Sequence, residues 1–327
     1  MIHIKAIIVK QPGGVEQLEM VDYAKPEPKE NELLIRVHAS AVNRLDIITR
    51  EQGARYYDHP ILGVEVAGIV EKTVSGSGIE EGARVMGLVS GGGYAEYAVM
   101  PADRAMLIPE NLSFEEAAAI PEVFLTAYQT LFWLGELQKD ETVLIHAGGS
   151  GVGTAAIQLA KQLGQAKVIM TAGSKEKVDF GLKLGADVGI NYKEQSFDQE
   201  VMAATDKQGV DLIMDFVGAS YWEKNMASIK VDGRWILIGF LGGSTLNQLN
   251  IEGLIAKRIK MIGTTLSTRS DEYKARLSKE FMEKTNELFT NKKLQPIVDK
   301  VFPLADIKQA HQYMEANKNI GKIILTV

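Results

Sequence analysis

The chain has 327 residues, of which 46% are hydrophobic and 24% charged, a composition typical of globular proteins at a length that predicts two domains. Its formal net charge of −6 argues against a general nucleic-acid or acidic-membrane surface. Because the chain contains no cysteine, disulfides, thiolate nucleophiles and cysteine-based zinc sites are excluded. We expect neither a signal peptide nor a membrane span, and a cytoplasmic location.

Residues 1–120 are rich in short β-branched or alternating runs separated by glycine and proline clusters. Such runs predict short strands joined by turns, as in a small barrel or rolled sheet. The expected strands cover residues 2–9, 32–40, 64–74, 83–88 and 94–100.

A helical stretch follows these strands. Ser113 precedes Glu116 by three residues, the spacing of a capping box at the start of a helix. Pro121 breaks this helix, and a second helix is expected over residues 123–133.

Residues 142–174 predict a βαβ unit with a glycine-rich turn. A strand at 142–146 and a helix ending near Gly164 flank the turn, and a second strand is expected at 167–171. Glycine at a strand–helix junction lets the backbone approach a ligand, and the N–H groups and helix dipole there favour a phosphate. The fingerprint G-x-G-x-x-[GA] has two alignments, one on Gly151, Gly153 and Ala156 and one on Gly148, Ser150 and Gly153. The second places the tight turn directly after the strand, as the mechanism requires.

The end of the second strand distinguishes the two nicotinamide cofactors. An NAD site usually carries an acid about 20 residues after the first glycine, to hold the ribose 2′-hydroxyl. Residues 168–174 contain no acid and end in Gly173 and Ser174, and Lys177 follows. A hydroxyl and an ammonium group suit a 2′-phosphate, so we favour NADPH. The alternative roles are a helix N-cap for Ser174 and a solvated helix lysine for Lys177.

From residue 140 onward, strands and helices alternate. Strands are expected near 142–146, 167–171, 187–191, 210–216, 234–239 and 259–264, which predicts a six-stranded doubly wound parallel sheet. After residue 268 we expect helix 273–289, strand 296–301, helix 307–316 and strand 320–327. The natural partition is a β-rich domain, 1–122 and 268–327, with an inserted nucleotide-binding domain at 123–267.

Several stretches together resemble the zinc-free quinone oxidoreductase (zeta-crystallin-like) family of the medium-chain dehydrogenase/reductase superfamily. Those stretches are residues 39–46, 62–65, 92–96, 190–192 and 215–218, with the glycine turn. Residues 218–225 and 313–322 are most similar to the animal quinone oxidoreductases induced by a tumour suppressor. The resemblance implies an α/β fold, with a chaperonin-10-like β-barrel domain and an inserted Rossmann domain.

The resemblance also implies a set of cofactor contacts in the cleft between the two domains. The nicotinamide is expected near Asn43, Thr126 and Thr130, and the pyrophosphate near Val152 and Gly153 in the turn that includes Ser150 and Gly151. The pocket for the adenosine phosphate would contain Gly173, Ser174, Lys177 and Tyr192. Asn317 is expected to close over the cofactor. The remaining expected contacts end strands at the carboxyl edge of the sheet: Phe216, Gly239, Phe240, Leu241, Thr264, Thr265 and Leu266.

The chain departs from the zinc-dependent relatives at two ligand positions. Those relatives place cysteine at the position of Asn43 and histidine at that of Val64. We therefore expect no metal site.

Without a metal, reduction of an electron-poor acceptor is easier than alcohol oxidation, because no Lewis acid or base is evident for the hydroxyl proton. The expected reaction is hydride transfer from NADPH to a quinone, in a pocket of Asn43, Asp46, Tyr56 and Tyr57 with Leu241 opposite. The tyrosines would stack on a planar quinone, although half-exposed loop aromatics are an equal alternative. Asp46 has the alternative role of capping the turn.

Two other functions remain open. One is NADPH-dependent reduction of an activated alkene, such as an enone, an alkenal or an enoyl thioester. The other is cofactor binding with little catalysis, as in a crystallin or an RNA-binding protein. Relatives of this kind commonly dimerise by pairing edge strands of the nucleotide-binding domains, so we expect a homodimer through residues 260–266.

Overall fold

We describe a computed structural model, covering residues 2–53, 59–249 and 251–327. The chain divides into two compact units, which are described separately. Unit 1 comprises Met1–Leu125 and Leu266–Val327, and unit 2 is Thr126–Thr265. The domain boundaries expected from the sequence were 122/123 and 267/268.

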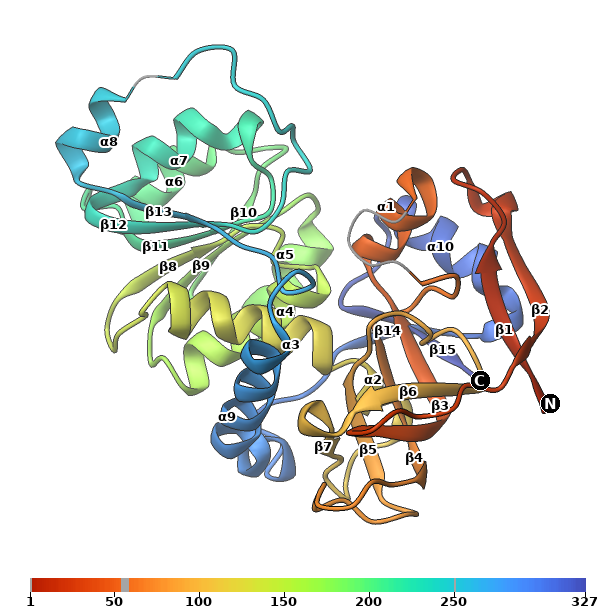
Figure 1. Ribbon diagram of the computed structural model, residues 1–327. Helices are drawn as coiled ribbons and strands as arrows, with labels where there is room; N and C mark the ends of the chain where they lie inside the picture. Colours follow the sequence, from red (N-terminus) through yellow and green to blue (C-terminus); the bar gives the residue numbers. More distant parts are fainter. Residues whose placement is uncertain (1, 54–58, 250) are drawn as a thin grey trace. The chain divides into compact units, whose positions relative to one another are not determined.

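Unit 2 contains a parallel sheet of six strands, with helices on both faces (Figure 1). The strand order is β10-β9-β8-β11-β12-β13, so the chain starts in the middle, builds one half and then crosses to build the other. The strands are β8 (Thr142–Ile145), β9 (Lys167–Ala172), β10 (Val188–Asn191), β11 (Val210–Asp215), β12 (Ile229–Leu237) and β13 (Lys260–Gly263). The helices are α4 (Gly151–Gln162), α5 (Lys175–Lys183), α6 (Phe197–Ala204), η4 (Ala219–Tyr221), α7 (Trp222–Ser228) and α8 (Glu252–Lys257).

The strands of this sheet are apolar, which explains why the sheet lies in the core of unit 2. Every residue of β11 is buried, and Ile213 and Trp235 belong to a core cluster with residues of β8, β9 and β10. Continuous apolar runs are typical of strands covered on both faces. The order of the strands reverses between β8 and β11, and in such sheets ligands bind outside the carboxyl ends at this point. The glycine turn follows β8 directly.

Unit 1 is built around an antiparallel sheet with one parallel pair, β14 and β15. The structure confirms strands at all five positions expected before residue 120, and adds β2 and β7, which the sequence did not indicate. β2 buries only Leu18, so its sequence has no clear apolar/polar alternation, and β7 has only two residues. The strands are β1 (His3–Val9), β2 (Leu18–Ala24), β3 (Glu32–Val42), β4 (Glu65–Lys72), β5 (Arg84–Leu88), β6 (Tyr97–Pro101), β7 (Met106–Leu107), β14 (Val298–Pro303) and β15 (Lys322–Thr326).

The helices of unit 1 lie at the ends of strands and over the sheet (Figure 1). The capping box is confirmed, because the Ser113 hydroxyl accepts from the Glu116 N–H and the Glu116 carboxylate accepts from the Ser113 N–H. The helices are η1 (Val15–Gln17), α1 (Arg44–Gln52), η2 (Ala102–Arg104), α2 (Phe114–Ala118), α9 (Asp271–Thr290), η5 (Leu304–Asp306) and α10 (Ile307–Glu315).

One helix runs from unit 1 into unit 2. It begins as α3 (Pro121–Tyr128) and continues as a π-helical turn, η3 (Gln129–Leu134). Pro121 occupies the first helical position, where its missing N–H costs nothing. Among the described residues, no helix is long and apolar enough to cross a membrane.

Candidate functional site

The glycine turn of unit 2 joins β8 to α4. Ser150 is the N-cap of α4, and its hydroxyl accepts from the Gly153 N–H at 3.0 Å. A Cβ atom on Gly153 would lie 2.3 Å from the carbonyl oxygen of Ala147, so only glycine fits there. Gly153 is therefore the glycine that allows close packing of helix on strand, which supports the alignment on Gly148, Ser150 and Gly153.

Two N–H groups at the start of α4 have no acceptor among the described residues, those of Gly151 and Val152. The sequence had pointed to Val152 and Gly153, but the Ser150 hydroxyl takes the Gly153 N–H. Free N–H groups and the dipole of a twelve-residue helix favour an anion at this place. The turn thus fits one pyrophosphate.

Polar and cationic side chains lie together at the end of β9. Ser174 is the N-cap of α5, and its hydroxyl accepts from the Lys177 N–H at 3.3 Å. The Lys177 side chain lies over the glycine turn, because a Cβ on Gly149 would be 3.0 Å from Lys177 Cδ. A Cβ on Gly173 would be 2.7 Å from the Tyr192 hydroxyl and 3.3 Å from Lys193 Cε.

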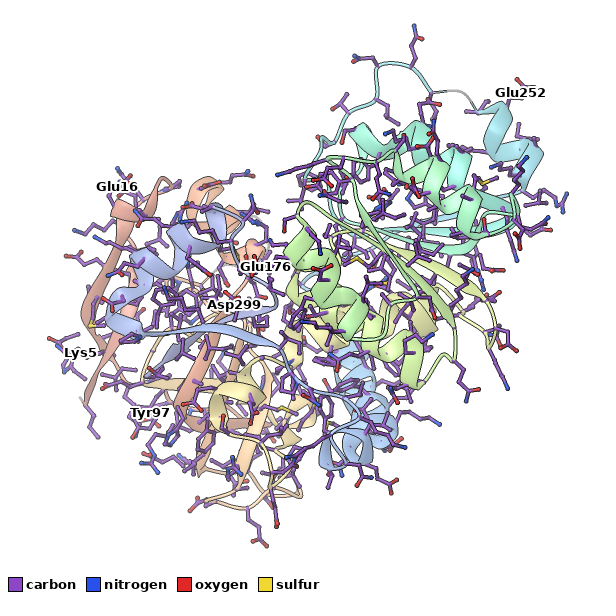
Figure 2. All side chains as sticks on the ribbon, turned by 180° about the vertical axis from the view of Figure 1, so that it is seen from behind. Lys5, Glu16, Tyr97, Glu176, Glu252 and Asp299 are labelled. Carbon is purple, nitrogen blue, oxygen red and sulfur yellow. The ribbon has the colours of Figure 1, made fainter. Side chains whose placement is uncertain are left out.

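Lys193 is a cation that the sequence reasoning missed. The only signal for it was its position directly after Tyr192, at the end of β10. Together with Lys177 it gives this corner of the sheet two ammonium groups. Glu176, labelled in Figure 2, is the one acid in the first turn of α5, and it is exposed.

The loops after β11 and β12 are joined by main-chain hydrogen bonds. The Leu241 N–H donates to the Phe216 carbonyl at 3.1 Å, and a Cβ on Gly239 would be 3.0 Å from the same oxygen. Phe240 and Leu241 are 43% and 65% exposed, so an apolar surface is available beside the carboxyl edge. Thr264 follows β13, where its N–H donates to Leu237.

A buried polar network supports these loops from below. Asp215 accepts from the N–H groups of Val217 and Gly218 with one carboxylate oxygen. Its other oxygen accepts from Asn225 Nδ2 and Trp235 Nε1, both at 3.1 Å. The carboxylate at the end of β11 is thereby satisfied by four N–H groups.

His146 completes this network. Burial lowers its pKa, so it is a neutral imidazole. Because Asn225 donates through Nδ2, its Oδ1 must accept from His146 Nε2, at 2.7 Å. His146 Nδ1 then accepts from the Thr171 hydroxyl at 2.9 Å. Each member therefore has one allowed orientation, which fixes strands β8, β9 and β11 against α7.

Asn43 in unit 1 lies just before α1 and is buried. Its Oδ1 accepts from Lys322 Nζ at 2.6 Å, and its Nδ2 donates to Glu65 Oε1 at 2.8 Å. Lys322 Nζ also donates to Glu65 Oε1 at 2.8 Å, so the three side chains form a closed triangle. This arrangement fixes which end of the Asn43 amide points in each direction.

Asp46 caps the turn, which was the alternative role predicted for it. It is fully buried; its Oδ2 accepts from the Asn43 N–H and the Tyr94 hydroxyl, and its Oδ1 accepts from the Gly63 N–H. Asp46 thus holds the turn that presents Asn43. Tyr56 and Tyr57 lie outside the described residues.

The Tyr94 hydroxyl is oriented in turn by His311. Arg50 donates to His311 Nδ1 at 3.2 Å, so His311 Nε2 carries the proton and donates to the Tyr94 oxygen at 3.4 Å. Burial, and then the charge of Arg50, lower the pKa of His311 to about 3. It stays neutral at ordinary pH, and Tyr94 is left to donate to Asp46.

Two other residues that were expected to contact the cofactor, Asn317 and Thr130, form hydrogen bonds within the protein. Asn317 Oδ1 accepts from Arg44, the residue after Asn43, at 2.8 Å. The Thr130 hydroxyl is buried and donates to the Thr126 carbonyl at 2.7 Å, at the start of the π-helical turn. Contact of Thr126 and Thr130 with the nicotinamide stays a prediction.

Known proteins resemble this chain over nearly its whole length. Residues 29–110 match the family model described as alcohol dehydrogenase GroES-like domain, and residues 151–283 match zinc-binding dehydrogenase. Human quinone oxidoreductase is 31% identical over 98% of this chain and 97% of its own. The chain belongs to the quinone oxidoreductase family of the medium-chain dehydrogenase/reductase superfamily. The expected fold, a GroES-like domain with a Rossmann domain, is confirmed.

Three solved structures of this superfamily resemble the chain over 99% of its length. A mycobacterial protein in complex with NADPH is 32% identical with a TM-score of 0.86, and the match covers 100% of the mycobacterial chain. An NAD-dependent alcohol dehydrogenase is 32% identical with a TM-score of 0.88, over 99% of that chain. The CurF ER cyclopropanase of curacin A biosynthesis is 27% identical with a TM-score of 0.85, over 99% of that chain. As a member of this superfamily, the chain is an oxidoreductase.

The donor set of unit 1 does not fit the zinc of the zinc-dependent relatives. The Asn43 amide is already bonded at both ends, and Val64 offers no ligand atom. Within the described ranges, no three histidine, cysteine, aspartate or glutamate side chains are grouped to hold a metal ion. The donor set of unit 2, by contrast, fits a dinucleotide.

Proposed function

We propose that this quinone oxidoreductase relative transfers hydride from NADPH to quinones without zinc. The observation that carries the cofactor assignment is the corner of unit 2 where Lys177 and Lys193 flank Ser174 and Tyr192. Two cations and two hydroxyls suit a 2′-phosphate. The exposed Glu176 opposes this only weakly, since water screens it.

The chain's own residues then have defined tasks. The N–H groups of Gly151 and Val152 would hold the pyrophosphate, and the loops at Phe216 and Leu241 would cover the apolar ring system. NADPH, when bound, would supply the hydride. Asn43 has no basic or nucleophilic atom, and Glu65 and Lys322 hold its amide in one orientation, so it would orient the reactants only through the second hydrogen or the second lone pair of that amide. Orientation suffices for an electron-poor quinone.

Lys177→Ala is expected to weaken NADPH binding roughly tenfold and to leave NADH binding nearly unchanged. A charge-assisted contact to a phosphate is worth about 1.5–3 kcal/mol before screening, and about 1.4 kcal/mol is tenfold. Titration of both cofactors at two salt concentrations measures this, and the salt dependence of NADPH binding should become flatter.

The matched control is Lys175→Ala, in the same helix. Lys175 is exposed and pairs with Asp179, so its loss should change neither affinity. Equal weakening of NADH and NADPH by Lys177→Ala would remove the main support for NADPH.

An acceptor panel tests the reaction itself. Turnover of NADPH with quinones is expected to exceed turnover with enones and enoyl thioesters by tenfold or more in kcat/KM. The likeness to the CurF ER cyclopropanase makes reduction of an activated alkene the second candidate. A preference for enones would establish that candidate instead. NADPH binding with no turnover of any acceptor would identify a cofactor-binding protein.

Association is proposed on one structural observation. Strand β13 forms one edge of the described sheet of unit 2, as residues 260–266 were expected to do. Edge strands present free main-chain groups to a second copy. We infer a homodimer through this edge.

A further inference from the structure

Two acidic residues of unit 1, Glu65 and Glu122, are joined by a hydrogen bond from the main chain of Glu122, but their side chains have different environments. Glu65, the first residue of β4, is completely buried. Its Oε1 accepts from Lys322 Nζ and Asn43 Nδ2, and its Oε2 accepts from the main-chain N–H of Glu122 at 2.8 Å. Three N–H groups, one of them an ammonium, therefore satisfy the Glu65 carboxylate.

Glu122 has the opposite environment. Its main-chain N–H reaches Glu65, but the described residues give its carboxyl group no hydrogen-bond donor. Burial, and then the negative charge of Glu65, raise the pKa of Glu122 to about 8. Glu65 has an ammonium partner in Lys322, whereas the described residues give the Glu122 carboxyl group none, so Glu122 keeps its proton at neutral pH.

The Glu122 side chain faces a cavity within unit 1. The cavity has a volume of about 40 Å³, enough for about two or three water molecules. Part of its wall is polar, and one wall atom, Arg104 Nε, is buried with no partner among the described residues. Water needs such polar partners. The lining residues are Val64, Leu88, Val89, Ser90, Arg104, Glu122, Leu266, Ser267 and Lys274.

The charged groups around Glu122 come from five elements. Glu65 of β4 and Asp46 of α1 favour its neutral form, and Lys322 of β15 and Lys274 of α9 favour its anion. Arg104 of η2 lies on the cavity wall, and its guanidinium is paired with Asp271. Lys322 is already engaged by Glu65, and Lys274 donates to the Ser267 carbonyl. The cations are therefore occupied, and the neutral acid persists.

We propose that Glu122 is the proton store of the reduction. Hydride addition leaves a negative charge on the acceptor oxygen. The O–H bond of Glu122 then breaks, its proton passes through cavity water to that oxygen, and the carboxylate recovers a proton from bulk water. One hydride and one proton together account for the two-electron reduction. This inference rests on the proposed function, and its test separates the two.

The first experiment observes the proton directly, without cofactor or acceptor. The infrared band of a protonated carboxyl group should be present at pH 6, disappear as the pH rises through about 8, and be absent from Glu122→Gln. The exposed residue Glu110 provides the control, because Glu110→Gln should leave the band unchanged. A wild-type spectrum with no such band at pH 6 would overturn the proposal.

Stability against pH reports the same proton. The unfolded chain releases it near pH 4.5, whereas the folded chain holds it to about pH 8. The contribution of Glu122 is therefore complete below pH 4.5 and declines as the pH rises to 8. Glu122→Gln should remove this decline, and an identical decline in wild type and variant would count against the proposal.

The second experiment measures turnover of a quinone with NADPH. Wild-type kcat is expected to fall as the pH rises through about 8. Glu122→Gln should lower kcat about tenfold at pH 6.5 and remove this pH dependence, with the KM for quinone and the Kd for NADPH unchanged. Glu122→Asp, which keeps an acid, should retain the pH dependence even if Glu122→Gln folds poorly.

The outcomes are distinguishable. If wild type reduces quinones and Glu122→Gln keeps its rate and pH profile, the proton store is wrong and the proposed function stands. If no acceptor is turned over but the infrared band behaves as expected, the proposed function fails and Glu122 remains a neutral acid.

Discussion

Lys322→Met is expected to lower the free energy of unfolding by about 3–5 kcal/mol, because it leaves an unpaired carboxylate in the core. Lys322 and Glu65 are both buried, and the ammonium group is the only cation bonded to Glu65 among the described residues. The substitution also leaves the Asn43 Oδ1 without its 2.6 Å donor. Urea unfolding at pH 7 measures the loss.

A second substitution tests whether the unpaired Glu65 carboxylate causes the loss in the free energy of unfolding. Lys322→Met combined with Glu65→Gln should recover about half or more of the loss, because a neutral amide has replaced the carboxylate. The exposed pair Arg258–Asp232, with side chains 64% and 66% exposed, provides the control. Arg258→Met should cost about 1 kcal/mol or less. A loss of that size for Lys322→Met would contradict the prediction.

Asp215→Asn is expected to cost about 2–5 kcal/mol in unit 2. The new amide would place N–H groups against Asn225 Nδ2 or Trp235 Nε1, which now donate to the carboxylate. Asn225 cannot turn over, because its Oδ1 is bonded to His146. At least one buried donor is therefore left without an acceptor.

The same change should weaken NADPH binding, since Asp215 also holds the N–H groups of Val217 and Gly218 in the loop after β11. Thermal unfolding and cofactor titration of the same variant test both effects. Asp232→Asn, at an exposed aspartate, should change neither. Stability of Asp215→Asn within 1 kcal/mol of wild type would mean that the network rearranges freely.

Local chemistry explains what could be predicted. The segments that form β8, β9 and β11 are mostly apolar, as is typical of buried strands. Glycines mark the turn after β8. The caps at Ser113 and Ser174 depend on residues three positions apart. Such signals act between near neighbours, so they are visible in the sequence.

Other local features escaped prediction for equally local reasons. The helix α1 itself was not predicted, although capping of a turn was the alternative role given to Asp46, which caps this helix together with Asn43. The π-helical turn η3 inserts its irregularity into an apolar stretch that also fits an α-helix. Lys193 follows a strand end like any solvated lysine. In each case the sequence pattern is compatible with two structures.

The sequence by itself determined the doubly wound sheet and the glycine turn, and it predicted the two-domain partition and a 2′-phosphate site at the polar end of β9. Only the tertiary structure brought Glu65 to Glu122, 57 residues apart, and to Lys322, 257 residues apart. Whether a carboxyl group keeps its proton depends on which donors reach it and how much water is excluded, and both depend on contacts between distant elements. For that reason Lys322 looked like any strand-end lysine, and Glu122 like any acid in a first helical turn, until the fold had placed them.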